Sequence, residues 1–594
     1  MRVVDRRMLT PALKEDPRMS TARSNSTSST REQALEELIT RPRAEVLVIG
    51  GGINGLATFR DLALQGVDVV LVERGDFASG ASSASSHMIH GGIRYLENGE
   101  FRLVRESVQE RNGLLTIAPH YVKPLRTTIP IYSTFSGILA APLRFLTHKQ
   151  GKPQERGALL IKVGLVLYDT FSRNGGSVPR HRFLGRRRSL AELPLLNRGL
   201  KYTATYYDAS MHDPERLALD VLRDGLDASE TARAVNYLEA VGASEDGVLL
   251  RDRESGREFS LKADVVVNAA GPWTDLTNAA MGAPSTYMGG TKGSHVVLDN
   301  PELLAATGGR EIFFENSDGR IVLIYPLKGR VLVGTTDLEA DARETAVITE
   351  DEIDYFFDLV AQVFPTIGVD RSQIVYTFSG IRPLPKHDDT QPGFVSRDYR
   401  IVTDVSSALG VPVLSLVGGK WTTFRALAEH LSSNVLAVLK RQRTVSTEGL
   451  AIGGGAGYPV TDDSRRAWVA ARSSLSATRV EQLLEQYGTR ADEVIAFLGD
   501  DTAENFIAGT TLSEQEVEYF ATVERAVHIV DVVLRRSSVA FVGAVTPAVL
   551  RGVGIAMARI LGWSDETLQA EIDDARRELI DLHSVRMSVG AEVS

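Results

Sequence analysis

The strongest constraint on the fold is the stretch 44–73, which predicts a strand, a glycine turn, a helix and a second strand in succession. The runs 46–49 and 67–72 are short and apolar, as in parallel strands that are buried on both faces. Between them stand glycines in the pattern G-x-G-x-x-G, followed by apolar residues at helical spacing. The motif alone could be a packing turn, but within this complete unit it predicts a dinucleotide site.

Each part of this unit has a physical role in binding a dinucleotide. The first glycine allows a tight turn, the second lets backbone approach a pyrophosphate, and the third lets the helix pack on the strand. The helix N-terminus offers free N–H groups and a partial positive charge to the phosphates. An acid ends the second strand, where it can accept hydrogen bonds from both ribose hydroxyls. We therefore expect cofactor contacts from Gly50, Gly52, Ile53, Asn54, Gly55 and Glu73. The motif does not separate FAD from NAD.

Length, charge and composition limit the other functions. With 594 residues the chain is long enough for two or three domains. Its net charge of −10 gives no support to nucleic-acid binding. The chain has no cysteine, which excludes disulfides, thiolate metal ligands and cysteine nucleophiles. We expect no metal site.

The N-terminal segment 1–43 is expected to be a disordered tail. Within it, 20–31 is rich in Ser and Thr and has almost no apolar residues, so it cannot pack against a core. No apolar stretch of the kind found in a secretory signal precedes that run.

Two apolar segments, 135–146 and 158–168, are too short to span a bilayer, which requires roughly 20 apolar residues. They are interpreted either as buried core or as a surface that dips into one leaflet of a membrane. Such a surface would be helped by basic residues that meet anionic headgroups, although solvated surface charge is their ordinary role. A basic run lies just downstream, at Arg180, Arg182, Arg186, Arg187 and Arg188.

A second candidate segment follows directly on the dinucleotide unit. Residues 80–97 read GASSASSHMIHGGIRYLE. The small residues let backbone approach a ligand closely. The polar residues after them, His87, His90, Arg94 and Tyr95, are candidates to converge on that ligand.

Five further motifs are spread along the chain. They are DVVVNAAGPW at 264–273, KGSH at 292–295, a hairpin pattern at 321–337, SGIRPL at 379–384 and GGKWTTFR at 418–425. In order and spacing the whole set resembles the FAD-dependent, aerobic-type glycerol-3-phosphate dehydrogenases. The resemblance extends from about residue 44 to the C-terminus.

The predicted fold is α/β, with a Rossmann-like FAD-binding domain, an antiparallel-sheet cap domain and an all-α C-terminal domain. The first two resemble glutathione reductase and D-amino-acid oxidase. The hairpin pattern is assigned to the cap because it needs an antiparallel partner. The domains are expected at 44–125, 200–290 and 375–440 for FAD binding, 126–199 and 291–374 for the cap, 441–463 for a linker, and 464–594 for the helical domain. Helices of that last domain are expected at 464–471, 479–487, 491–498, 513–523, 526–536, 547–561 and 565–584.

The resemblance implies that sn-glycerol 3-phosphate is oxidised to dihydroxyacetone phosphate by hydride transfer from C2 to flavin N5. Arg94 and Arg382 would clamp the phosphate, because a guanidinium pairs bidentately with it. Tyr95 would contact the substrate beside them. Arg382 could instead act near the C2 oxygen. His90 is the candidate proton acceptor, because an imidazole can take a proton at neutral pH.

Other residues are implied in weaker or supporting roles. His87 and His295 are alternatives to His90 as the base, and Lys420 would stabilise the reduced flavin or contact a substrate oxygen. The last motif departs from the family, since Trp421 and Phe424 stand where an aliphatic or Met residue and often Tyr are usual. The segment 133–156 also looks longer than in the shorter bacterial members. Further contacts to FAD are expected from Ser82, Ser83, Ser86, Gly91, Ala270, Gly271, Gly419, Lys420 and Thr422.

The electron acceptor is left open by the sequence. A membrane quinone fits the apolar segments and the basic run, and would place the protein in the cytoplasm, peripheral on the inner face of the cell membrane. Molecular oxygen, as in related glycerol-3-phosphate oxidases, is the alternative. An amine oxidase of the same fold and a non-catalytic flavin-bound sensor are also weighed, and the set His90, Arg94, Arg382 and Lys420 argues against the sensor. A homodimer is kept as an alternative to a monomer.

Overall fold

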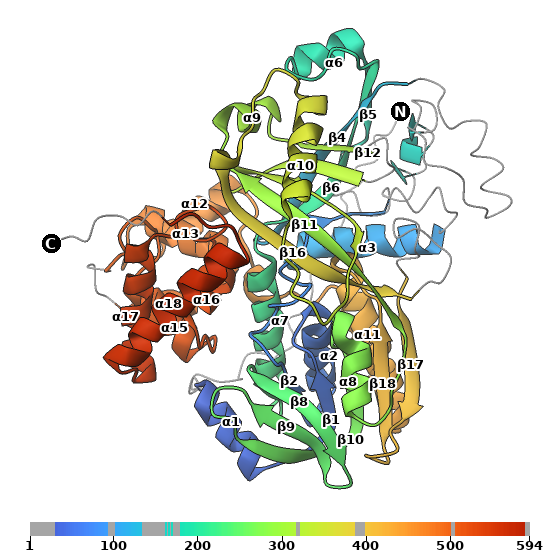
Figure 1. The fold of residues 1–594 in the computed structure, drawn as a ribbon, viewed down its shortest axis with the longest axis vertical. Helices are drawn as coiled ribbons and strands as arrows, with labels where there is room; N and C mark the ends of the chain where they lie inside the picture. The colour runs from blue at the N-terminus through green and yellow to red at the C-terminus, as the bar shows by residue number, and fades with distance from the viewer. Residues whose placement is uncertain are drawn as a thin grey trace, which may run out of the picture.

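The computed structural model describes residues 30–92, 101–133, 161–169 apart from 163 and 167, 179–315, 321–386, 398–499 and 505–587. In Figure 1 one sheet with its helices forms the lower part of the molecule, a second sheet lies above it, and the C-terminal helices pack at one side. Several predicted features lie outside the described residues, namely Arg94, Tyr95, the apolar segment 135–146 and the tail as far as residue 29.

The lower sheet has the strand order β17-β18-β10-β1-β2-β7. The strands from β18 to β7 are parallel, and β17 closes one edge antiparallel to β18. The β8–β9 hairpin pairs with the first half of β10. The bounds are β1 (Arg43–Ile49), β2 (Val69–Val72), β7 (Arg233–Val235), β8 (Leu238–Ser244), β9 (Gly247–Asp252), β10 (Glu258–Asn268), β17 (Arg400–Val405) and β18 (Pro412–Val417).

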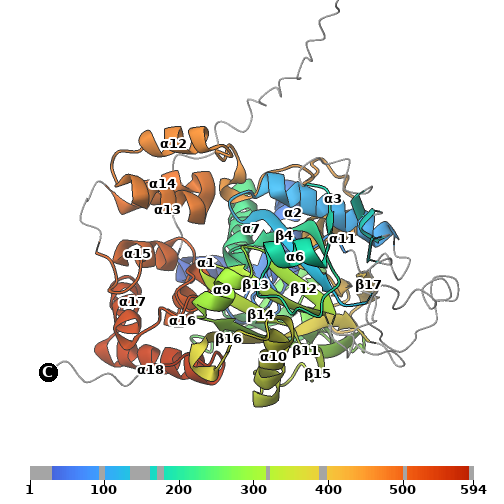
Figure 2. The same ribbon diagram turned by 90° about the horizontal axis from the view of Figure 1, so that it is seen from above.

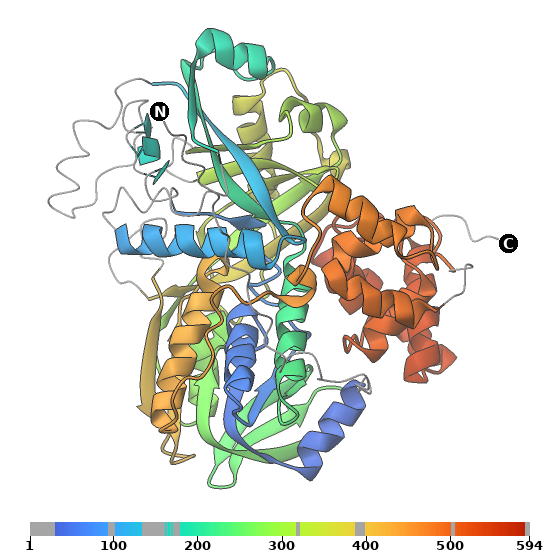
Figure 3. The same ribbon diagram turned by 180° about the vertical axis from the view of Figure 1, so that it is seen from behind.

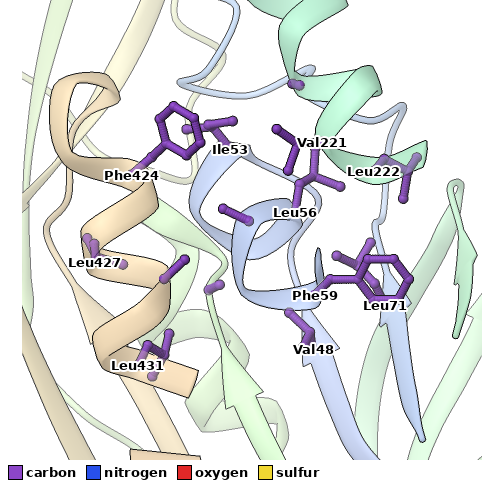
Figure 4. Close-up of a cluster of buried hydrophobic side chains, with 14 of the residues drawn as sticks. Val48, Ile53, Leu56, Phe59, Leu71, Val221, Leu222, Phe424, Leu427 and Leu431 are labelled. Carbon is purple, nitrogen blue, oxygen red and sulfur yellow. The ribbon is translucent and has the colours of Figure 1, made fainter. Parts of the chain in front are cut away.

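Both faces of this sheet are buried, which explains why its strands are continuously apolar. Val46 and Val48 pack into a cluster with α2, α7 and α11, whereas Leu47 and Ile49 join a second cluster with α1 and the β8–β9 hairpin. Figure 4 shows the first cluster, with Phe59 of α2 lying near the sheet and residues of α7 and α11 on either side. The helices are α1 (Arg31–Thr40), α2 (Ile53–Leu64), α7 (Pro214–Ala228), α8 (Thr274–Ala280) and α11 (Phe424–Val438).

The upper sheet is mostly antiparallel, in the order β15-β11-β14-β13-β12-β4-β6-β3, with β16 paired to β11 and β5 to β6. The predicted hairpin is confirmed as β13–β14, and its turn has positive φ at Lys328 and Gly329. The strand bounds are β3 (Met88–Ile89), β4 (Val122–Ile131), β5 (Arg182–Gly185), β6 (Tyr202–Met211), β11 (Met288–Leu298), β12 (Glu311–Glu315), β13 (Ile321–Leu327), β14 (Arg330–Gly334), β15 (Leu338–Glu339) and β16 (Ile374–Pro385). Its helices are α3 (Phe101–Ile117), α6 (Arg186–Glu192), α9 (Pro301–Ala306) and α10 (Glu350–Val363).

The predicted domain boundaries are wrong at three strands. The FAD-binding ranges 44–125, 200–290 and 375–440 include β3, β6 and most of β16, but these strands lie in the upper sheet. β6 pairs with β4 along its whole length, and β16 pairs with β11. A buried strand pattern predicts a strand but not its partner, because the partner is distant in sequence.

The expectation of a disordered tail over 1–43 is wrong for its last part, which forms α1. Thr30 caps the helix, and its hydroxyl accepts a hydrogen bond from the Gln33 N–H. Leu35 and Leu38 are buried against the lower sheet. The helix is held there by an ion pair between the buried Arg31 guanidinium and the Asp252 carboxylate.

The C-terminal helices form a domain with its own apolar core, which lies beside α7 in Figures 2 and 3. The predicted helical domain is confirmed. The helix expected over 526–536 differs, because only Ile529–Asp531 is α-helical (α16) and Val532–Arg536 forms a π-helical turn. The other bounds are α12 (Asp462–Ala470), α13 (Ala477–Tyr487), α14 (Ala491–Leu498), α15 (Glu514–Thr522), α17 (Pro547–Leu561) and α18 (Asp565–Asp581).

A histidine joins this domain to the lower sheet. His528 Nδ1 lies 2.9 Å from Glu571 Oε1 of α18, and Nε2 lies 3.3 Å from Glu254 Oε1 in the β9–β10 turn. Hydrogen bonds and charge from these carboxylates outweigh the effect of burial and raise the pKa of His528 to about 11. The imidazolium therefore bridges two carboxylates from two domains.

This bridge makes stability depend on pH. The pKa of an unfolded histidine is about 6.5, so the contribution of the bridge is complete below that pH and is lost as pH rises toward about 11. We expect His528→Gln to lower the melting temperature at about pH 6, and the gap to wild type to shrink steadily between about pH 7 and 10. Thermal unfolding across this range measures the gap, and a gap that grows with pH would contradict the bridge.

Candidate active site

A cavity of about 620 Å³ opens where β1, β2 and β10 end, the edge at which parallel sheets bind ligands. Ten of the predicted cofactor residues line it, namely Gly50, Gly52, Ile53, Asn54, Glu73, Ser82, Ala270, Gly271, Gly419 and Lys420. Five other predicted cofactor residues, all within the described ranges, do not line the cavity: Gly55, Ser83, Ser86, Gly91 and Thr422. The dinucleotide unit, the Ser-rich segment and the GGKWTTFR motif thus enclose one space.

The glycines of the first turn are set by close backbone contacts. Gly50 has φ +113°, and a Cβ there would lie 2.6 Å from the carbonyl oxygen of Ala269. A Cβ on Gly55 would lie 1.9 Å from the Gly50 carbonyl oxygen, so Gly55 serves packing and not the cavity. A Cβ on Gly52 would meet only the Ser82 hydroxyl, at 3.2 Å. Of the three motif glycines, Gly52 is therefore the one with open space beside it for a ligand.

Glu73 directly follows β2 and lies in the cavity wall. Its Oε2 accepts a hydrogen bond from the Gly51 N–H at 2.6 Å, and its Oε1 accepts one from the Gly75 N–H at 2.8 Å. Burial raises the pKa of Glu73, and these two N–H groups oppose that shift. The carboxylate is thus oriented by the turns on both sides of it. Nearby, the Arg74 guanidinium lies 4.2 Å from the ring centre of Trp273, which also lines the cavity.

The Ser-rich segment is tied to both glycine motifs. Ser82 Oγ accepts the Ile53 N–H at 2.9 Å, at the N-terminus of α2, and Ser82 O accepts the Trp421 indole N–H at 3.0 Å. Ser83 Oγ donates to the Gly80 carbonyl at 3.0 Å, within its own turn. Trp421, the departure from the family pattern, therefore forms part of the cavity wall and fastens the segment.

The GGKWTTFR motif brings a cation to the cavity. Lys420 lines the cavity, and its Nζ donates to Ser107 Oγ of α3 at 2.8 Å. Thr422 Oγ1 donates to the main-chain carbonyl of His90 at 3.3 Å. The second motif thus fixes the backbone of the segment that carries the candidate base.

Arg382 lies on β16, next to Pro383, which lines the cavity. Its Nη1 donates to Asp337 Oδ1 at 2.7 Å, and its Nη2 donates to Thr335 Oγ1 and to the Thr336 carbonyl, both at 2.9 Å. The sequence did not indicate these partners. The guanidinium is therefore oriented by the loop after β14.

The three candidate histidines lie in different surroundings. His90 is partly exposed, whereas His87 and His295 are buried. Burial lowers the pKa of His87 to about 4 and that of His295 well below its ordinary value. His295 Nε2 lies 2.8 Å from Ser86 Oγ, and its ring stacks on Phe378. Both buried imidazoles are neutral at physiological pH.

A buried carboxylate that sequence reasoning missed holds the backbone after His90. Asp208 Oδ1 accepts the Gly91 N–H at 2.9 Å, and Arg111 and Tyr168 donate to the same oxygen at 3.2 and 2.5 Å. A Cβ on Gly91 would lie 2.1 Å from the Tyr168 hydroxyl. An aspartate inside the buried run of β6 was the signal that could have revealed this role.

The comparisons with known proteins agree with this geometry. The family described as FAD dependent oxidoreductase matches residues 45–424, and the C-terminal domain of alpha-glycerophosphate oxidase matches residues 445–568. A glycerol-3-phosphate dehydrogenase of Synechocystis is 33% identical, over 89% of this chain and 95% of the relative. A D-erythritol 1-phosphate dehydrogenase of Brucella abortus is also 33% identical, over 83% and 94%.

Two further relatives extend the comparison. The aerobic glycerol-3-phosphate dehydrogenase of Escherichia coli is 31% identical, over 83% of this chain and 93% of the relative. The FAD complex of a glycerol-3-phosphate dehydrogenase from Bacillus halodurans has the same fold, with a TM-score of 0.70 at 23% identity, and covers 94% of this chain and 98% of that one. The chain belongs to the FAD-dependent glycerol-3-phosphate dehydrogenase family.

The cofactor of this family is FAD, and the cavity fits it. The space is bordered by a glycine with room for a pyrophosphate, a helix N-terminus and an acid at the end of β2. Asn54 lies in the same wall, in the first turn of α2, and its buried side-chain oxygen has no protein hydrogen-bond partner.

The turn at Gly52 can be tested by FAD retention. We expect Gly52→Val to abolish it, because the side chain would occupy the place of the pyrophosphate while meeting little protein. Gly113→Val in α3 is the control, since a Cβ there meets no atom within 4 Å. FAD released on denaturation is measured for both purified variants. Full FAD content in Gly52→Val would contradict the placement.

Proposed function

We propose that this protein oxidises sn-glycerol 3-phosphate to dihydroxyacetone phosphate. The main support in the structure is that Lys420 and Pro383 of β16 line the same cavity. Arg382, the neighbour of Pro383 in the chain, is oriented by Asp337 and Thr335. A cation there suits a substrate that is held by its phosphate while its carbinol carbon meets the flavin. The relatives named glycerol-3-phosphate dehydrogenases support the same substrate.

In this proposal each residue has a separate task. Bound FAD would supply the hydride acceptor. Arg382, together with Arg94, would hold the phosphate and so fix C2 for transfer. His90, whose carbonyl is held by Thr422, would accept the proton of the C2 hydroxyl. Lys420 would place positive charge where reduction adds negative charge.

A longer polyol phosphate is the second candidate substrate. The D-erythritol 1-phosphate dehydrogenase is as similar to this chain as the Synechocystis enzyme, at 33% identity for each. Both substrate names share a phosphate ester on a polyol, so the clamp would serve either. Comparison of kcat/KM for the two compounds separates the candidates.

We further propose that the electrons pass to a membrane quinone and that the protein lies peripherally on the inner face of the cell membrane. None of the helices in the described ranges has the length and hydropathy needed to cross a bilayer. The basic run is partly suited to a membrane surface, since Arg186, Arg187 and Arg188 of α6 are all exposed, whereas Arg182 pairs with Glu192. Molecular oxygen is the competing acceptor.

One anaerobic experiment tests substrate and acceptor together. Glycerol 3-phosphate should bleach the flavin band of the holoenzyme, and D-erythritol 1-phosphate should do so more slowly. The reduced enzyme is then mixed either with anionic vesicles that contain a quinone or with aerated buffer. We expect faster reoxidation by the vesicles. No bleaching would reject the proposed substrate, and faster reoxidation by oxygen would assign an oxidase.

The clamp can be tested by changing Arg382 to lysine. Arg382→Lys keeps the charge but loses the planar fork that Asp337 and Thr335 orient. Because the phosphate fixes C2, we expect kcat/KM for glycerol 3-phosphate to fall about 100-fold, roughly 3 kcal/mol, and that for glycerol to fall much less. Arg371→Lys, at an exposed surface ion pair, is the control. Equal losses for both substrates would instead place Arg382 at the C2 oxygen.

A further inference from the structure

The segment 73–82 forms one wall of the FAD cavity and is also a contact point for the C-terminal domain. Residues on both sides of Asp76 line the cavity, namely Glu73, Arg74, Gly75, Ser79, Gly80, Ala81 and Ser82. Asp76 itself is 1% exposed. Its carboxylate accepts hydrogen bonds from two arginines that lie 459 and 460 positions later in the chain.

These arginines saturate the Asp76 carboxylate. Oδ2 accepts the Arg535 Nε–H at 2.6 Å and also bonds to Arg536 Nη1. Oδ1 accepts Arg536 Nη2 at 2.9 Å and Asn236 Nδ2 at 3.0 Å. Such forked pairing fixes the carboxylate in direction as well as in position. Arg536 is completely buried and Arg535 nearly so.

The backbone that presents the arginines is itself unusual. Both stand in the π-helical turn Val532–Arg536, and short π-helical turns occur frequently at functional sites. Asp531, just before the turn, accepts Arg535 Nη2 and the Tyr237 hydroxyl, at 2.5 and 2.6 Å. The turn is therefore held between two carboxylates, one from each domain.

The β7–β8 connection also links the cavity wall at 73–82 to the C-terminal domain. The Tyr237 N–H donates to the Gly75 carbonyl at 2.9 Å, and the Leu238 N–H donates to the Glu73 carbonyl at 2.7 Å. The Tyr237 side chain contacts Asp531 of the C-terminal domain. The cavity wall thus meets that domain through Asp76 and through Tyr237.

We propose that the C-terminal helical domain positions the FAD-binding wall through Arg535 and Arg536 acting on Asp76, and so sets the affinity for FAD. A buried arginine is tolerated only while its carboxylate partner is in place, so docking of the domain and the position of 73–82 are coupled. The coupling is reciprocal, and bound FAD should also stabilise the π-helical turn. The three residues are positioning residues, and the inference does not depend on which polyol phosphate is oxidised.

The first test compares two interdomain variants. Asp76→Asn removes the charge that the arginines bind, whereas Arg490→Gln breaks ion pairs of the same domain to Asp220, Asp224 and Asp227 on α7. FAD is removed, and the Kd is measured by titration with FAD. We expect Asp76→Asn to raise the Kd about 10-fold or more and Arg490→Gln to change it less than about 2-fold while lowering thermal stability. An unchanged Kd in Asp76→Asn, or equal effects of the two variants, would overturn the proposal.

The second test needs no variant and decides the matter if Asp76→Asn does not fold. Amide hydrogen exchange of the wild-type chain is measured with and without FAD. We expect FAD to slow exchange about 10-fold or more over 529–537, with little change in α12 to α14 of the same domain. Equal exchange over 529–537 in the two states would refute the coupling.

Discussion

A Cβ on Gly55 would stand 1.9 Å from the Gly50 carbonyl oxygen, and a Cβ on Gly50 would stand 2.6 Å from that of Ala269. Neither contact leaves room for a side chain. Both positions must therefore be glycine for the first turn of α2 to lie directly against the end of β10. That contact aims the N-terminus of α2 into the cavity and brings the ends of β1, β2 and β10 to one edge. Every other wall of the FAD site is placed relative to this edge.

One helix, α7, links this part of the FAD site to the C-terminal domain. The apolar side of α7, including Val221 and Leu222, packs on α2, as Figure 4 shows. Its charged side contacts the helical domain, where Arg216 pairs with Glu524 at 2.6 Å and both are buried. Buried ion pairs add little net stability because desolvation opposes their attraction, but each requires its own partner. The interface therefore favours one docking position of the helical domain, whereas a purely hydrophobic interface could slide.

The parts of the fold that sequence predicts correctly are those set by local chemistry. The β13–β14 turn needs positive φ at two successive positions, and Lys328–Gly329 between alternating apolar runs indicates this within a few residues. Helices of the C-terminal domain likewise follow from their own periodicity. By contrast, β6 and β16 have clear strand patterns, yet their sheet is decided by β4 and β11, which lie far away in the chain. Local propensity carries no information on that choice.

The same distinction between local motifs and long-range contacts holds for the candidate site. The long-range contact that matters most there is the one between the two sheets. The turn glycines and Glu73 follow from one motif, whereas Arg382 and Asp337 are 45 positions apart and meet only in the fold. Arg382 is oriented by the upper sheet, but FAD is held mainly by the lower one, so their relative position depends on how β16 meets the Ser-rich segment. A Cβ on Gly380 would lie 2.3 Å from the Ala84 Cβ. A glycine at this place lets β16 touch that segment, and a side chain there would push the strand, and Arg382 with it, away from the Ser-rich segment.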